Sequence, residues 1–154
     1  MIYSGKKAVV LGLGHSGEAA GILLCEEGAD VTICDSNDGP GLREKASKLK
    51  AQGIKALLGS AADSDPALYD VCILSPGIDP AVPLVRNVAR KRIPIIGELE
   101  LAFEECICPV VAITGTNGKT TTTELTTSML LGAGVRTMAS GNIGLPFATA
   151  VRQS

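Results

Sequence analysis

Residues 6–17 read KKAVVLGLGHSG, and their pattern is the strongest indication of the fold. The first half of this stretch is an aliphatic run, which predicts a buried strand, and its second half has the glycine spacing GxGxxG. Residues 16–27, which follow, carry small or apolar side chains at helical spacing. In such a loop Gly12 permits a tight turn, Gly14 lets a phosphate approach the backbone, and Gly17 lets the helix pack close to the strand. This order of strand, glycine loop and helix predicts a site for a nucleotide or a diphosphate.

The rest of the chain continues the alternation of aliphatic runs and helical patterns. Further strands are expected at 30–34, 54–58, 71–74, 94–96, 109–113 and 135–139, and further helices at 42–52, 82–91, 98–105 and 118–131. Continuous aliphatic strands separated by helices indicate a parallel sheet that is covered on both faces. We therefore predict an α/β fold in three parts. Residues 1–95 would form a Rossmann-like domain, 96–108 a connector, and 109–154 the opening strand–loop–helix unit of a partial ATP-binding domain.

The composition narrows the classes of function. Apolar residues make up 45% of the 154 residues and charged residues 19%, which is typical of a folded chain. The low aromatic content of 3% and the net charge of −2 argue against a nucleic-acid partner. The single histidine, His15, excludes a multi-histidine metal site. The N-terminus lacks a signal-peptide profile, and no run approaches the roughly 20 apolar residues of a membrane span.

Cysteines and acidic residues carry two further expectations. The five cysteines contain no CxxC pair, so we expect reduced, mostly buried thiols in a cytoplasmic protein. Separately, we expect the protein to be a monomer. Structural burial is also favoured over redox chemistry for Cys106 and Cys108, which flank Ile107. Acidic residues cluster between the two expected domains, where a solvated connector face is favoured over a metal or substrate role; they are Glu98, Glu100, Glu104 and Glu105.

The sequence of the first glycine loop does not identify its ligand. Asp35 ends the second expected strand, as an acid does in many dinucleotide sites, but the motif does not choose between NAD and another nucleotide diphosphate. His15 lies at the tip of the loop, where it is either a solvent-exposed residue or a ligand contact. No partner carboxylate is near it in the sequence, so we do not assign it an acid–base role.

A second glycine loop, TGTNGKTT, occupies residues 114–121 between an expected strand and an expected helix. It keeps the GxxGKT core of a P-loop, although Ile113 stands at the position of the first glycine. Its Thr and Asn side chains could serve only as helix caps, but a cap does not require Gly-Lys-Thr at this junction. Backbone N–H groups would cradle phosphates, Lys119 would neutralise the β/γ-phosphates, and Thr120 would be the Mg²⁺ ligand. The predicted ATP contacts are Gly115, Thr116, Asn117, Gly118, Lys119, Thr120 and Thr121.

Four segments, in this order, resemble the Mur ligase family. They are GLGHSG (12–17), SPGI (75–78), ITGTNGKTTT (113–122) and GNIGLP (141–146). The GTNGKTT segment is characteristic of Mur and folylpolyglutamate-type ligases. A Rossmann-like domain together with SPGI and GNIG is similar to the branch that adds D-glutamate.

The resemblance implies a ligase that uses ATP and Mg²⁺ to add D-glutamate to UDP-N-acetylmuramoyl-L-alanine, a peptidoglycan precursor, through an acyl phosphate. Lys119 would act on the transferred phosphoryl group, and Asn142 would contact the muramoyl side and help to position the reacting carboxylate. Asn37 stands where the family often has an arginine. The residues implied to bind the UDP-linked substrate are Gly14, His15, Ser16, Asp35, Ser36, Ser75, Pro76, Gly77 and Asn142.

Other parts of the family pattern have no counterpart in these 154 residues: a metal-binding Glu, a substrate-contacting His, a modified Lys and the D-glutamate domain. We therefore expect the chain alone to be inactive. Two rival hypotheses remain, an NAD(P)-binding dehydrogenase and a nucleotide-sensing regulatory module. A dehydrogenase needs only the first loop, and an ordinary P-loop NTPase needs only the second.

Overall fold

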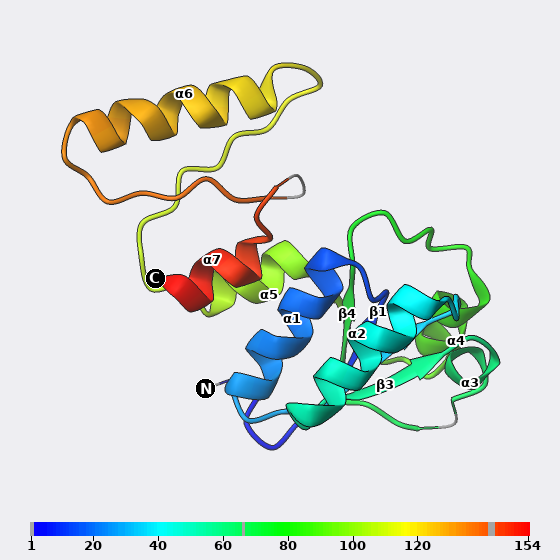
Figure 1. The fold of residues 1–154 in the computed structure, drawn as a ribbon. Helices are drawn as coiled ribbons and strands as arrows, with labels where there is room; N and C mark the ends of the chain where they lie inside the picture. Colours follow the sequence, from blue (N-terminus) through cyan, green and yellow to red (C-terminus); the bar gives the residue numbers. More distant parts are fainter. Residues whose placement is uncertain (1, 66, 142–143) are drawn as a thin grey trace.

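A five-stranded, all-parallel sheet forms the centre of the molecule (Figure 1). The computed structural model describes residues 2–65, 67–141 and 144–154. The strand order is β3-β2-β1-β4-β5. Strands β2 and β3 are added on one side of β1, and β4 and β5 on the other, so the strand order reverses between β1 and β4. In such sheets ligands bind beyond the carboxyl ends of the strands at this reversal. The strands are β1 (Lys7–Leu11), β2 (Asp30–Asp35), β3 (Lys55–Leu58), β4 (Val71–Leu74) and β5 (Ile95–Gly97).

Helices cover both faces of the sheet, as the sequence predicts. Alternate residues of β1 enter different cores: Ala8 and Val10 face one side, and Val9 and Leu11 face the other. The first core is completed by α1, α2, α5 and α7, and the second by α3 and α4. The helices are α1 (His15–Glu26), α2 (Pro40–Ala51), α3 (Ser60–Asp63), α4 (Pro83–Arg90), α5 (Glu98–Glu104), α6 (Lys119–Gly132) and α7 (Phe147–Gln153).

The strands predicted at 109–113 and 135–139 are not formed in the part of the chain that the structure describes. Val110 and Val111 are exposed, and α6 buries none of its residues. Figure 1 shows α6 standing away from the sheet. An aliphatic run becomes a strand only when another strand pairs with it, and neither segment finds such a neighbour here.

Helix α7 is not among the helices that the sequence predicts. It packs against α1 and α5, with Ala148 fully buried (Figure 1). The guanidinium of Arg152 donates two hydrogen bonds to the carboxylate of Glu26 on α1, with Nε to Oε2 at 2.6 Å. The last turn of the chain thus lies against the first helix.

Among the described residues, no helix combines the length and the apolar character that crossing a membrane requires.

Candidate nucleotide-binding site

The first glycine loop is fixed to the carboxyl edge of the sheet from both sides. Gly12 has φ +96°, a left-handed conformation that favours glycine, and its N–H donates to the carbonyl of Cys34 at 2.8 Å. Ser75, directly after β4, donates its N–H to the carbonyl of Leu11 at 3.1 Å. Its hydroxyl donates to the carbonyl of Gly12 at 3.3 Å. Backbone from β1, β2 and β4 therefore meets at this loop.

The three motif glycines differ in their surroundings. A Cβ at Gly17 would lie 1.9 Å from the carbonyl oxygen of Gly12 and 2.6 Å from the hydroxyl oxygen of Ser75. Only glycine permits helix α1 to approach the strand so closely. A Cβ at Gly14, the N-cap of α1, would have nothing within 4 Å. The space beside Gly14 is thus open to a ligand.

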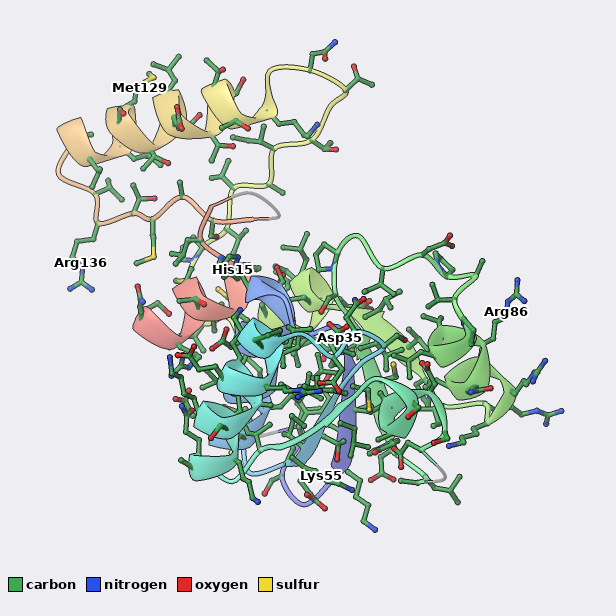
Figure 2. The ribbon with its side chains drawn as sticks, turned by 45° about the vertical axis from the view of Figure 1, so that its right-hand side comes forward. His15, Asp35, Lys55, Arg86, Met129 and Arg136 are labelled. Carbon is green, nitrogen blue, oxygen red and sulfur yellow. The ribbon has the colours of Figure 1, made fainter. Side chains whose placement is uncertain are left out.

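Asp35 lies against the same loop. One carboxylate oxygen accepts the N–H of Leu13 at 2.9 Å, and the other accepts the backbone N–H and side-chain amide of Asn37 at 2.9 and 3.0 Å. Figure 2 shows His15 and Asp35 toward one end of the sheet domain and Lys55 toward the other. Ser36 instead contacts α3, where its hydroxyl donates to the carboxylate of Asp63 at 2.7 Å. Asp35 thus helps to hold the loop.

A cavity of about 250 Å³ lies at this edge of the sheet. It brings together five of the nine residues implied to bind the UDP-linked substrate: Gly14, His15, Ser16, Ser75 and Pro76. Gly141, Gly144 and Pro146 of the GNIGLP segment also line the cavity, and Asn142 of that segment lies outside the described residues. Asp35 and Ser36 are not part of the lining. Gly77 instead lines an adjacent cavity of about 400 Å³ beyond the ends of β4 and β5.

Glu98 corrects the expectation of a uniformly solvated acidic face. It is 1% exposed, and one carboxylate oxygen accepts the N–H of Ala148 in α7 at 2.7 Å. The other oxygen is buried without a hydrogen-bond partner among the described residues. Burial raises the pKa of Glu98, and the hydrogen bond from Ala148 opposes that rise. Glu98 therefore ties α7, and with it the turn that walls the cavity, to the end of β5.

The second glycine loop lies between an unpaired segment and helix α6, and it is exposed. Gly118 has φ +76° directly before α6, and residues 114–122 are exposed. The ammonium of Lys119 donates to the carbonyl of Gly115 at 2.6 Å, across the mouth of the loop. Backbone N–H groups at the start of a helix and one lysine cation fit an anionic phosphate. In the part of the chain that the structure describes, no buried residue of 114–122 or of α6 supports this loop, in contrast to the first loop.

The cysteines match the sequence prediction only in part. Cys34 and Cys72 are buried in the sheet, and Cys25 is half-buried. The expectation of burial is wrong for the other two, because Cys106 is half-buried and Cys108 is exposed. They follow the end of α5 in a segment that pairs with no strand among the described residues.

A protein-family model described as the N-terminal domain of MurD-like Mur ligases matches residues 6–97. A UDP-N-acetylmuramoylalanine–D-glutamate ligase of Pelotomaculum thermopropionicum is 38% identical over 151 residues, covering 98% of this chain and 33% of that protein. The ligase of that name from Streptococcus uberis is 41% identical, covering 94% and 32%. This chain thus spans about a third of the length of the curated relatives it matches.

Solved structures support the same fold. A pseudomurein peptide ligase type C from Methanothermus fervidus is 30% identical with a TM-score of 0.56, covering 84% of this chain and 27% of that one. A murein peptide ligase from Psychrobacter arcticus has a TM-score of 0.58 at 22% identity over 84% and 27% of the two chains, a likeness of fold alone. Together with the glycine loop and the parallel sheet, these matches show that the chain belongs to the Mur ligase family, through its MurD-like N-terminal domain.

Proposed function

We propose that this chain is the N-terminal part of an ATP-dependent amide ligase. The reaction joins D-glutamate to UDP-N-acetylmuramoyl-L-alanine during peptidoglycan-precursor synthesis in the cytoplasm. The observation that carries the proposal is the cavity at the reversal of the sheet, because it combines the first glycine loop, Ser75 and Pro76, and the 141–146 turn. Curated relatives that match nearly the whole chain carry the name of this ligase.

The cavity suits the diphosphate of the substrate. Residues 14–16 form the start of helix α1 and line the cavity. The free N–H groups and the positive end of the helix dipole lie there, which is favourable for phosphate oxygens. The open side of Gly14 lets those oxygens approach the backbone. Asp35 and Ser36 would lie toward the uridine, Ser75, Pro76 and Gly77 would complete the pocket, and Asn142 would contact the muramoyl side.

The second loop would bind ATP. ATP supplies the phosphoryl group that activates the carboxylate of the substrate, and Mg²⁺ shields its charge. Residues 115–118 would surround the phosphates, and Lys119 would exchange the carbonyl of Gly115 for a phosphate oxygen. Thr120 would hold Mg²⁺ and Thr121 a phosphate. Residues 1–95 would then be the UDP-substrate domain, 96–108 a connector, and 109–154 part of the ATP domain of a monomeric enzyme.

A dinucleotide-binding dehydrogenase domain is the main rival, since GxGxxG and Asp35 lie together in the structure as they would in an NAD site. In this structure both carboxylate oxygens of Asp35 already accept hydrogen bonds from Leu13 and Asn37. A ribose would have to compete with these bonds or share the oxygens.

Calorimetric titration of the 154-residue chain with UDP and, separately, with NADH distinguishes the two hypotheses. We expect UDP to bind and NADH not to bind. Gly14→Ala places a methyl group in the open side of the cavity and should weaken UDP binding at least about tenfold, or about 1.4 kcal/mol. Gly41→Ala, an equally open position on α2, is the matched control and should leave binding unchanged. Binding of NADH without UDP would refute the proposal.

A further inference from the structure

Two thiols meet in the segment that follows α5. The sulfur atoms of Cys106 and Cys108 are 3.3 Å apart, and the Cys106 thiol also lies 3.5 Å from the carbonyl of Cys108. Cys108 is exposed, and Ile107 between them is 95% exposed. The backbone therefore already folds back far enough to hold both sulfur atoms in contact at the surface.

The other three cysteines have different surroundings. Cys34 and Cys72 lie within the sheet, where burial raises the pKa of each thiol to about 12. Cys25 is half-buried, and its thiol lies 3.5 Å from the carbonyl of Gln52. Access to solvent and contact with a second thiol coincide only at Cys106 and Cys108 among these five residues.

We propose that Cys106 and Cys108 form a reversible disulfide by exchange with a low-molecular-weight disulfide. The exposed Cys108 thiolate attacks one sulfur of the reagent, forms a mixed disulfide and releases one thiol. The Cys106 thiolate then attacks the Cys108 sulfur, closes the Cys106–Cys108 bond and releases the second thiol. The two protein thiols are oxidised, each gives up its proton, and the reagent disulfide is reduced to two thiols.

The assignment of roles follows from burial. Burial raises the pKa of the Cys106 thiol, so its thiolate is scarce and it is the poorer first attacker. Once Cys108 carries the mixed disulfide, contact between the two sulfur atoms places Cys106 next to its target. One intervening residue closes a small, strained ring, and strained, exposed disulfides are the readily reduced ones. The site is thus a redox-modifiable pair of thiols in the segment that follows α5.

The experiment is oxidation of the reduced chain with oxidised glutathione, followed by alkylation, trypsin digestion and mass spectrometry. Trypsin leaves Cys106 and Cys108 together on the peptide 93–119, Cys25 and Cys34 on 8–43, and Cys72 on 56–86. We expect the first of these peptides to become lighter by the two thiol hydrogens before a glutathione adduct appears on the others. Dithiothreitol should reverse the change.

Two single variants test the order of the steps. Cys106→Ser should trap a glutathione adduct on Cys108, because the resolving thiol is gone. Cys108→Ser should form an adduct on Cys106 much more slowly. An unmodified 93–119 peptide in the wild-type chain, or adducts on Cys25 that form as fast, would overturn the proposal. These outcomes do not depend on UDP or ATP binding, so they are independent of the proposed function.

Discussion

The two glycine loops share one sequence plan, an aliphatic run followed by glycines and a helix, yet they differ in what supports them. The first loop follows β1, which pairs on both sides, and opens α1, which buries Ala20 and Leu24 completely. The second follows an unpaired run at 109–113 and opens α6, which buries no residue. A glycine loop of this pattern can therefore be found from local sequence, whereas the packing around it depends on strands and helices elsewhere in the chain.

The largest expected difference between the two regions is in stability. Leu101→Ala empties a fully buried position in α5 and should lower the free energy of unfolding by about 3 kcal/mol. Leu125→Ala, at a 60% exposed position in α6, should change it by less than about 0.5 kcal/mol. Urea unfolding followed by circular dichroism measures both. Equal losses would mean that α6 is packed as firmly as α5.

Glycine substitutions test the same difference in packing next to the two loops. Gly17→Ala forces a methyl group against the carbonyl of Gly12 and should cost about 2 kcal/mol of stability, as overpacking typically does. Gly132→Ala at the end of α6 meets no atom within 4 Å and should be neutral or stabilise by up to about 1 kcal/mol. The same denaturation experiment reads both variants. Tolerance of Gly17→Ala would contradict the close approach of α1 to β1.

The two loops should also differ in the nucleotide that each one binds. Lys119→Ala removes the cation at the mouth of the second loop and should weaken ATP binding about tenfold, a change near 1.4 kcal/mol. UDP binding at the first loop should not change, because Lys119 is not among the residues that line that cavity. Lys50→Ala, at an exposed lysine on α2, controls for the loss of one positive charge. Parallel loss of UDP and ATP binding would show that the two loops do not act separately.

The smallest effect concerns pH and Glu98. Its pKa is raised in the folded chain, so the folded state binds its proton more tightly than the unfolded chain, whose glutamates ionise near pH 4.3, roughly. The contribution of Glu98 is therefore full below that pH and declines as the pH rises through the folded pKa. Glu98→Gln keeps an acceptor for the N–H of Ala148 and should flatten this part of the stability–pH curve.

The control for Glu98 is Glu98→Ala, which leaves the N–H of Ala148 without its acceptor. It should be less stable than Glu98→Gln by about 1 kcal/mol, the usual net value of one hydrogen bond. Thermal unfolding at several pH values compares the variants. Identical curves for the wild type and Glu98→Gln would show that the buried carboxyl group does not titrate differently on folding.

The sequence predicts the first region well because its signals are local and strong. All five strands of the sheet lie where aliphatic runs predict them, since parallel strands are buried on both faces. The glycine spacing also predicts the close approach at Gly17 and the turn at Gly12. Gly14, His15, Ser16, Ser75 and Pro76 do line one cavity.

What the sequence could not predict depends on partners distant along the chain. Glu98 looks like any solvated acid until α7, whose Ala148 contributes the N–H, packs over it. Helix α7 has only seven residues, about two turns, which is short for a pattern with a helical period. Likewise, the runs at 109–113 and 135–139 have the composition of strands, but composition does not supply a pairing partner.

The first loop should bind a nucleoside diphosphate without help from the second. Amide hydrogen exchange of the 154-residue chain, with and without saturating UDP, measures this. We predict that UDP slows exchange at residues 12–17 and 75–77 and leaves residues 115–121 exchanging rapidly in both states. Protection of 115–121 by UDP, or no protection at 12–17, would contradict independent binding at the first loop.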